Sequence, residues 1–304
     1  MSVLVLTEHD VRSLLTMADC IEAMDEVLRS LAQGDLHQPL RPVTRPEGAD
    51  SLMGLMPAYR GGERPAWSLK EIVIAPRNPG RGLDAHQGAV LLHDGDTGEL
   101  RALLNASAIT EIRTAAVSAV ATRALARPDS RVVAILGGGV QARSHGEAMR
   151  AVLPEAEVRT WTRRDGGTAE DVLQDADVVC TCTSAREPIL RHGWLATGAH
   201  VNAVGSSVPN ARELDEATVA AATLVVDRRE SALNEAGDLL LAGFGEERIA
   251  AELGEVLVGT HPGRTDTAEL TVFKSLGLGV EDLAAAELVV RKARARGIGT
   301  EVDF

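Results

Sequence analysis

Three small residues after a short apolar run give this sequence its first chemical signal. Residues 131–136 are mostly β-branched or apolar and lead into Gly137, Gly139 and Ala142, which form a G-x-G-x-x-A pattern. The apolar run predicts a buried strand, and the residues that follow the glycines predict a helix. Gly137 would permit a tight turn, Gly139 would leave room for a pyrophosphate, and Ala142 would let helix and strand pack closely. The pattern predicts a dinucleotide-binding turn, with the phosphates at the start of the helix.

The next predicted strand indicates which dinucleotide would bind. Residues 158–162 form an extended pattern whose last residue, Thr162, is followed by Arg163 and Arg164. An acidic residue here would bind the ribose of NAD, whereas an arginine would accommodate the additional phosphate of NADP. Because guanidinium groups suit a phosphate, NADP is favoured over NAD. The alternatives are a glycine turn without a ligand and an ordinary solvated turn in which the two arginines lie beside Asp165.

A lysine lies out of phase with the polar face of another predicted strand. In residues 67–75 the alternation of side chains places Lys70 on the same face as Ile72 and Ile74. A lysine directed toward an apolar face needs an anionic partner or a ligand. The alternative is an edge strand from which Lys70 extends to water.

An arginine precedes a run of small residues that predicts a closely packed helix. Residues 109–121 include Arg113, Thr114 and several alanines. If a helix begins near Arg113, its amide groups and the Thr114 hydroxyl would form a second anion site. The alternative is a surface cation near a helix start.

Composition limits the classes of function. The chain has 304 residues and a formal charge of -13, and aromatic residues make up 2%. This charge disfavours a nucleic-acid partner, and no apolar run reaches the ~18 residues of a membrane span. The sequence shows no export signal, and Cys20, Cys180 and Cys182 suggest no disulfide framework, so we expect a cytoplasmic protein. Histidine and cysteine spacing predicts no metal site.

The order of the predicted elements indicates two domains. Strand-like runs at 52–56, 67–75, 88–93 and 99–104 predict a mostly antiparallel sheet with attached helices. From residue 131 onward, strands alternate with helices, so we expect an α/β fold: a Rossmann domain with a doubly wound parallel sheet, joined to a mostly antiparallel α+β domain. We expect cofactor contacts from residues at strand ends and helix starts, namely Gly137, Gly139, Val140, Gln141, Thr114, Thr162, Arg163, Arg164, Thr183, Val204, Ser206 and Phe273.

Several longer motifs together resemble the ornithine cyclodeaminase/mu-crystallin family, and the similarity covers nearly the whole chain. These motifs are Gly54-Leu55-Met56-Pro57-Ala58-Tyr59, Lys70, Arg113 to Ala119, Gly137 to His145, Ala203-Val204-Gly205, Arg212-Glu213-Leu214 and Thr271 to Gly277.

The resemblance implies a homodimer with NAD(P)-dependent chemistry at the α-carbon of an amino acid or its imine. It implies that residues 1–113 with 278–304 bind the substrate and form the dimer contact, and that residues 114–277 bind the cofactor. It also implies that Arg41, Lys70 and Arg113 hold the substrate carboxylate.

Two departures from the cyclodeaminase pattern favour the mu-crystallin-like, ketimine reductase branch. Gly54 and Ser207 occupy the places of two carboxylates that cyclodeaminases use for amine handling and proton transfer. We therefore expect an NADPH-dependent reductase that makes an L-amino acid from an α-imino acid. The alternatives are a cyclodeaminase or alanine-dehydrogenase-like enzyme using NAD, and an NADPH-binding protein with little turnover. The side chain of the substrate is not indicated by the sequence.

Overall fold

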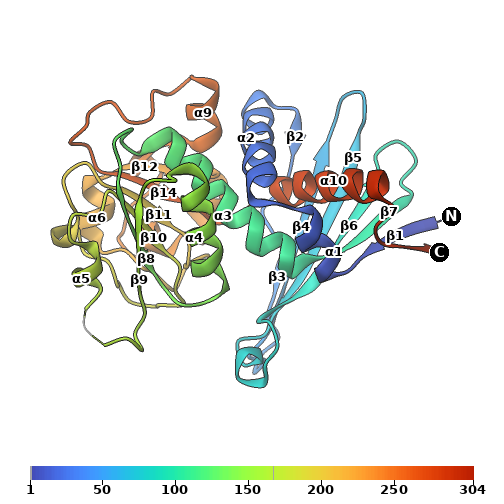
Figure 1. Ribbon diagram of the computed structural model, residues 1–304, viewed down its shortest axis with the longest axis horizontal. Helices are drawn as coiled ribbons and strands as arrows, with labels where there is room; N and C mark the ends of the chain where they lie inside the picture. The colour runs from blue at the N-terminus through green and yellow to red at the C-terminus, as the bar shows by residue number, and fades with distance from the viewer. Residues whose placement is uncertain (1, 167) are drawn as a thin grey trace. The chain divides into compact units, whose positions relative to one another are not determined.

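The computed structural model describes residues 2–166 and 168–304 (Figure 1). The chain divides into two compact units, one formed by Met1–Arg113 with Leu278–Phe304 and the other by Thr114–Gly277. The boundary at Arg113 and Thr114 falls inside one long helix, α3 (Ala106–Leu125). The first unit is therefore discontinuous in sequence, and the second is continuous.

The first unit contains an eight-stranded sheet in the order β15-β1-β7-β6-β5-β4-β2, with β3 paired to β4. Pairing is antiparallel except between β1 and β7. The strands are β1 (Ser2–Leu6), β2 (Leu36–His37), β3 (Val43–Thr44), β4 (Leu52–Arg60), β5 (Ala66–Ile74), β6 (His86–Asp94), β7 (Leu100–Asn105) and β15 (Thr300–Asp303). The expected antiparallel sheet is confirmed, and β5 is an inner strand because it pairs with both β4 and β6.

Three helices, α1 (Glu8–Leu14), α2 (Met17–Gln33) and α10 (Gly279–Arg296), pack together in the first unit. Thr7 caps α1 and Thr16 caps α2, since each hydroxyl accepts a hydrogen bond from a backbone amide of the first turn. Gly34 ends α2 in the left-handed conformation, at φ 87. Figure 1 shows α10 lying across the sheet, where it contacts β4, β5 and β6.

The second unit contains a seven-stranded, fully parallel sheet in the order β13-β12-β14-β11-β10-β8-β9. The strands are β8 (Val132–Leu136), β9 (Glu157–Trp161), β10 (Val178–Thr181), β11 (His200–Ala203), β12 (Thr223–Val226), β13 (Ile249–Glu252) and β14 (Thr271–Lys274). The order reverses at β8, because β9 lies on one side of it and β10 on the other. In such sheets ligands bind outside the carboxyl ends of the strands at this reversal, so the expected doubly wound α/β fold is confirmed.

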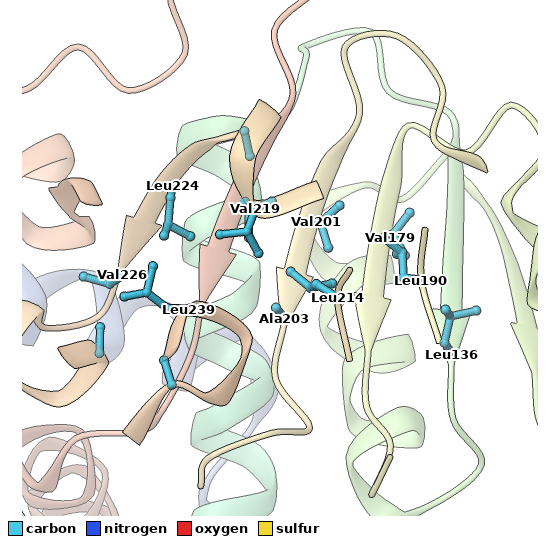
Figure 2. Packing of buried hydrophobic residues seen from close by; sticks show 14 of the residues in the cluster. Leu136, Val179, Leu190, Val201, Ala203, Leu214, Val219, Leu224, Val226 and Leu239 are labelled. Carbon is cyan, nitrogen blue, oxygen red and sulfur yellow. The ribbon is translucent and has the colours of Figure 1, made fainter. Parts of the chain in front are cut away.

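Helices connect these parallel strands. They are α4 (Val140–Val152), α5 (Ala169–Leu173), α6 (Glu216–Ala221), α7 (Arg229–Glu235), α8 (Gly237–Leu240) and α9 (Leu253–Val258), and single 3-10 turns occur at Asn78–Arg81 in the first unit and at His192–Trp194 and Glu246–Arg248 in the second. Figure 2 shows part of the apolar core on one side of this sheet, where Leu136, Val179, Val201 and Val226 project from β8, β10, β11 and β12. Burial of these side chains stabilises the sheet that presents the strand ends.

The structure corrects one expectation about α3. The helix begins at Ala106, seven residues before Arg113, so the amides of Arg113 and Thr114 lie in the helix interior. Interior amides are used by the helix itself, and the predicted anion site at a helix start near Arg113 is wrong.

In the described part of the chain, no helix is long and apolar enough to cross a membrane.

Two histidines in the second unit are held neutral by burial. Burial lowers the pKa of His145 to about 4 and that of His200 to about 3. His145 Nδ1 lies 2.8 Å from the carbonyl of Gln141, and its Nε2 lies 3.0 Å from Ser118 Oγ, so Nδ1 carries the proton.

These histidines predict acid sensitivity of the second unit. Between pH 6.5 and the lowered values only the unfolded chain binds the protons, so stability is complete above about pH 6.5 and falls as the pH decreases. From pH 7 to pH 5 each histidine should remove about 2 kcal/mol. In a Trp67→Phe background, fluorescence of Trp161 and Trp194 during urea unfolding reports this unit. The variant His145→Asn should show a shallower loss, and equal slopes with and without His145 would contradict the assignment.

Candidate active site

A cluster of buried charges lies on the helix-covered face of the first unit's sheet. Lys70 Nζ lies 2.8 Å from Asp282 Oδ2, and Arg113 lies 2.8 Å from Glu281 and 3.1 Å from Asp282. All four side chains are at most 4% exposed. The alternative of an edge strand for Lys70 is wrong, because β5 is an inner strand and its lysine has an anionic partner from α10.

The electrostatic surroundings of Lys70 favour its partial deprotonation near neutral pH. Burial lowers the pKa of Lys70 to about 8, Asp282 opposes this shift, and the positive charges of Arg113 and Arg41 add to it. The charge of Arg41 therefore acts on Lys70, and a site shared by the two residues stays a prediction. Thr110 Oγ1 also lies 3.4 Å from Lys70 Nζ.

The first turn of α10 lies beside Lys70, and the helix runs from there toward Arg60 at the end of β4. A Cβ on Gly279 would lie 3.1 Å from the carbonyl oxygen of Met56, which pairs with Lys70, and Glu287 farther along the helix pairs with Arg60. Gly54, Ile72 and Gly88 are paired across β4, β5 and β6 on the same face as Lys70. They lie on the side of Lys70 away from Arg60, so α10 runs away from them. They therefore lie beyond the amino end of α10, where two glycines flank a single isoleucine.

Sequence reasoning missed three residues of this site. No local pattern marks Glu281 or Asp282 as a site residue, although both side chains are fully buried. His86 pairs with Ile74 and so lies on the same sheet face as Lys70. Burial lowers the pKa of His86, the charge of Asp84 raises it, and the charges of Lys70 and Arg113 lower it further. Counting by twos back from Val90 could have placed His86 on this face.

In the second unit the glycine-rich turn has the geometry that a dinucleotide site requires. Gly137 has φ 139, and a Cβ there would lie 2.4 Å from the carbonyl oxygen of Cys182, so this turn excludes any side chain. A Cβ on Gly139 would meet nothing within 4 Å, which leaves open space beside the backbone. Gly139 precedes α4 without a side-chain cap, and Val140 and Gln141 are its first residues. The chain thus fits a dinucleotide phosphate at this helix start.

The other predicted cofactor residues fall into two groups. Thr162, Arg163, Arg164, Thr183, Val204 and Ser206 follow the carboxyl ends of β9, β10 and β11, and the two arginines are exposed. A Cβ on Gly138 would lie 2.7 Å from Thr162 Cγ2, so the arginine turn adjoins the glycine turn. Thr114 lies inside α3 and Phe273 is fully buried in β14, so neither side chain is presented at a strand end.

The parallel sheet and its glycine turn are typical of dinucleotide-binding enzymes. Comparison with known proteins identifies the chain as an NAD(P)-dependent oxidoreductase that acts on carbon–nitrogen bonds. The family model for the ornithine cyclodeaminase/mu-crystallin family matches residues 1–170 and 166–297, and the chain belongs to this family. It is 42% identical to ketimine reductase mu-crystallin of Mus musculus over 272 residues, which cover 84% of this chain and 85% of the relative.

Two solved structures resemble the whole chain. An archaeal alanine dehydrogenase dimer with bound NAD has a TM-score of 0.94 and 30% identity, and the match covers 100% of both chains. The Δ(1)-pyrroline-2-carboxylate reductase of Thermococcus litoralis, in complex with NADH and L-proline, has a TM-score of 0.91 and 34% identity, covering 99% of this chain and 100% of that one.

The space around Gly139 generates a test of the dinucleotide site. Gly139→Ala should leave the unfolding midpoint unchanged, because the added methyl meets no atom within 4 Å. It should weaken NADH and NADPH binding by about tenfold or more, since the methyl occupies the approach of the pyrophosphate. Fluorescence titration measures both dissociation constants. Gly193→Ala, whose Cβ also meets nothing within 4 Å, is the control, and equal affinities for all three proteins would contradict the assignment.

Proposed function

We propose that this protein is an NADPH-dependent imine reductase that forms an L-amino acid from an α-imino acid. The observation that carries the proposal is the buried group of Lys70 and Arg113 on one sheet face, with Arg41 near enough for its charge to act on Lys70. Lys70 and Arg113 are buried beside two carboxylates, Glu281 and Asp282, and the charge of Arg41 acts on Lys70 as well. Such a site suits a substrate with one carboxylate beside its reacting carbon.

The three cations would fix the orientation of the substrate. A carboxylate held by Arg41 and Arg113 would place the adjacent imine carbon at a defined distance from the side chain of Lys70, so catalysis would come largely from positioning. When bound, NADPH supplies the hydride that reduces this carbon. Glu281 and Asp282 hold Arg113 and Lys70 before substrate binds, so little reorganisation is needed.

Lys70 is the group placed to manage the proton. A protonated imine accepts hydride more readily than a neutral one, so an ammonium group beside the imine nitrogen would lower the barrier. The pKa of Lys70, lowered to about 8 by burial, makes this ammonium a stronger acid than an exposed lysine while leaving it mostly protonated at pH 7.

Position 54 supports a reductase over a cyclodeaminase. Gly54 pairs with Ile72 and lies on the face of Lys70, and a Cβ there would lie 3.7 Å from Ile72 Cγ2, an ordinary contact. The fold would therefore accommodate a side chain at this position, and the chain has none. A group for handling a second amine is lacking at the place where cyclodeaminases have a glutamate.

The reaction and the role of Lys70 can be tested together. Loss of NADPH absorbance should accompany reduction of a cyclic ketimine, iminosuccinate, or the imine from pyruvate and methylamine, with ornithine-to-proline conversion measured in parallel. The value of kcat/KM should be level below about pH 8 and fall tenfold per unit above it, because the acid form of Lys70 is required. Lys70→Met should reduce kcat by about 100-fold or more.

Lys292→Met is the control for this variant, because Lys292 pairs with Asp19 away from the charge cluster. Proline formation from ornithine without imine reduction would contradict the proposal in favour of a lyase. Binding of NADPH without turnover of any imine would contradict it in favour of a binding protein.

The preference for NADPH over NADH is proposed from Arg163 and Arg164. Both side chains are exposed beyond β9, next to the glycine turn, where a phosphate on the adenosine ribose would lie. Changing both arginines to serine should raise the Kd for NADPH by about tenfold and leave that for NADH within about twofold. Equal effects on the two cofactors would show that the arginines do not discriminate between them. Arg131→Ser, an exposed arginine before β8, is the control.

We also propose a homodimer formed by the first unit. The side chains on the sheet face opposite Lys70 include Met53, Tyr59, Trp67, Leu69 and Leu91, and of these Trp67 is 45% and Met53 41% exposed. Tyr59 and Trp67 stack with ring centroids 4.5 Å apart. A broad apolar face of this kind is typical of a permanent interface.

Leu69→Asp should convert the dimer to a monomer in sedimentation equilibrium, because it buries a charge at the centre of this face. Leu69 lies between Pro57 and Leu91 in the sheet. The control is Leu241→Asp, which changes a 48% exposed leucine in the other unit. A dimer that survives the first change, or a monomeric parent protein, would exclude this face as the interface.

The three buried, free cysteines support our proposal of a cytoplasmic location.

A further inference from the structure

A fully buried glutamate connects two strand ends of the parallel sheet. Glu213 Oε2 accepts hydrogen bonds from Thr181 Oγ1 at 2.6 Å and from the Gly205 amide at 2.7 Å. Its Oε1 accepts from the amide and the hydroxyl of Thr183, both at 2.7 Å. Thr181 ends β10, and Gly205 follows β11. One carboxylate therefore ties together the carboxyl ends of two neighbouring strands.

The backbone of Glu213 is held by a charged pair, Asp238 and Lys274. Asp238 Oδ1 accepts hydrogen bonds from the amides of Glu213 at 2.7 Å and Leu214 at 2.9 Å. Asp238 Oδ2 lies 2.8 Å from Lys274 Nζ at the end of β14. Burial raises the pKa of Glu213, as does the charge of Asp238, while Lys274 and the two threonine hydroxyls lower it. The network thus reaches a third strand end.

The strand end held by Glu213 supports the glycine turn. Cys182, between the two threonines, donates its amide to the carbonyl of Leu136 at 2.8 Å. Its own carbonyl oxygen is the atom that a Cβ on Gly137 would approach to 2.4 Å. A shift of Cys182 would therefore move the surface against which the glycine turn is built.

We infer that Glu213 is a positioning residue for the dinucleotide: it sets the positions of the β10 and β11 ends, and through Cys182 the position of the Gly137 turn. Glu213 is fully buried and does not contact the ligand itself. The inference rests on the NAD(P) binding of the proposed function. It assigns a role to a residue that the glycine and arginine patterns do not include.

The variant Glu213→Gln tests this role sharply. Each carboxylate oxygen accepts one backbone amide, from Thr183 or from Gly205, and a backbone amide cannot reverse its direction. Whichever way a glutamine side chain is turned, its NH2 group would face one of these donors. The two strand ends must then separate, so hydrogen exchange at the amides of Thr183 and Gly205 should accelerate. The Kd for NADPH and NADH should rise by about tenfold or more, equivalent to ~1.4 kcal/mol.

Glu269→Gln is the matched control. Glu269 also accepts a backbone amide, from Thr265 at 2.7 Å, and its other oxygen pairs with the hydroxyl of Thr223, at the amino end of β12. This change disturbs the amino ends of the strands, opposite to the end where the dinucleotide would bind. It should leave the Kd values for NADPH and NADH within about twofold, whatever it does to the unfolding midpoint. Increased Kd values in both variants would reduce Glu213 to a general contributor to stability and overturn the inference.

Two milder variants test the same role in case Glu213→Gln does not fold. Thr181→Val removes one hydroxyl donor and leaves both backbone amides in place, so Kd should rise two- to fivefold, and Thr181→Ser should restore it. Thr181 is fully buried, so this effect cannot come from contact with the ligand. Unchanged Kd in Thr181→Val and in folded Glu213→Gln would overturn the inference. A parent protein that binds neither dinucleotide would overturn the proposed function as well.

Discussion

The compensation of buried charge at the start of α10 is the interaction on which the first unit depends. Lys70 and Arg113 lie on different elements; Asp282 pairs with both, and Glu281 pairs with Arg113. Removing one partner of such a group leaves an uncompensated charge in the interior, which costs more than the pair contributes. The arrangement therefore fixes the position of α10 on the sheet and the direction of two cations with the same contacts. Structure and chemistry are specified by one set of side chains.

The second unit uses buried charge for a different purpose. Its sheet is held mainly by apolar packing between strands and helices (Figure 2), whereas the buried charges of Glu213, Asp238 and Lys274 lie near the carboxyl ends of β10, β11 and β14. Strand ends are the least constrained parts of a parallel sheet because their last carbonyls and amides leave the ladder. Glu213 accepts the amides of Thr183 and Gly205 beyond two strand ends, and Asp238, paired with Lys274, holds the backbone of Glu213. The sheet can then present a defined edge to a ligand.

Local sequence signals predicted the parts of the fold that depend on neighbouring residues. The glycine turn between β8 and α4 follows from residue types within a few positions, and the phase of β5 identified Lys70. The acidic partners of Lys70 and Arg113 could not be predicted in this way, because they come from a helix near the other end of the chain. Arg113 shows a second limit: the true helix start is marked only by Asn105, whose side chain accepts a hydrogen bond from the Ala108 amide, well before the small-residue run that drew attention.

The discontinuity of the first unit has a consequence for how the chain is made. During synthesis, β4 to β7 and the first turns of α3 leave the ribosome before the 164-residue segment Thr114–Gly277, whereas α10 and β15 leave after it. The continuous unit can fold on its own during translation, but the discontinuous one cannot finish. Until Glu281 and Asp282 emerge, Lys70 and Arg113 lack the carboxylates that permit their burial. The sheet face that carries Lys70 and the part of α3 that carries Arg113 therefore cannot pack fully until α10 emerges, and the buried charge cluster is completed after the continuous unit.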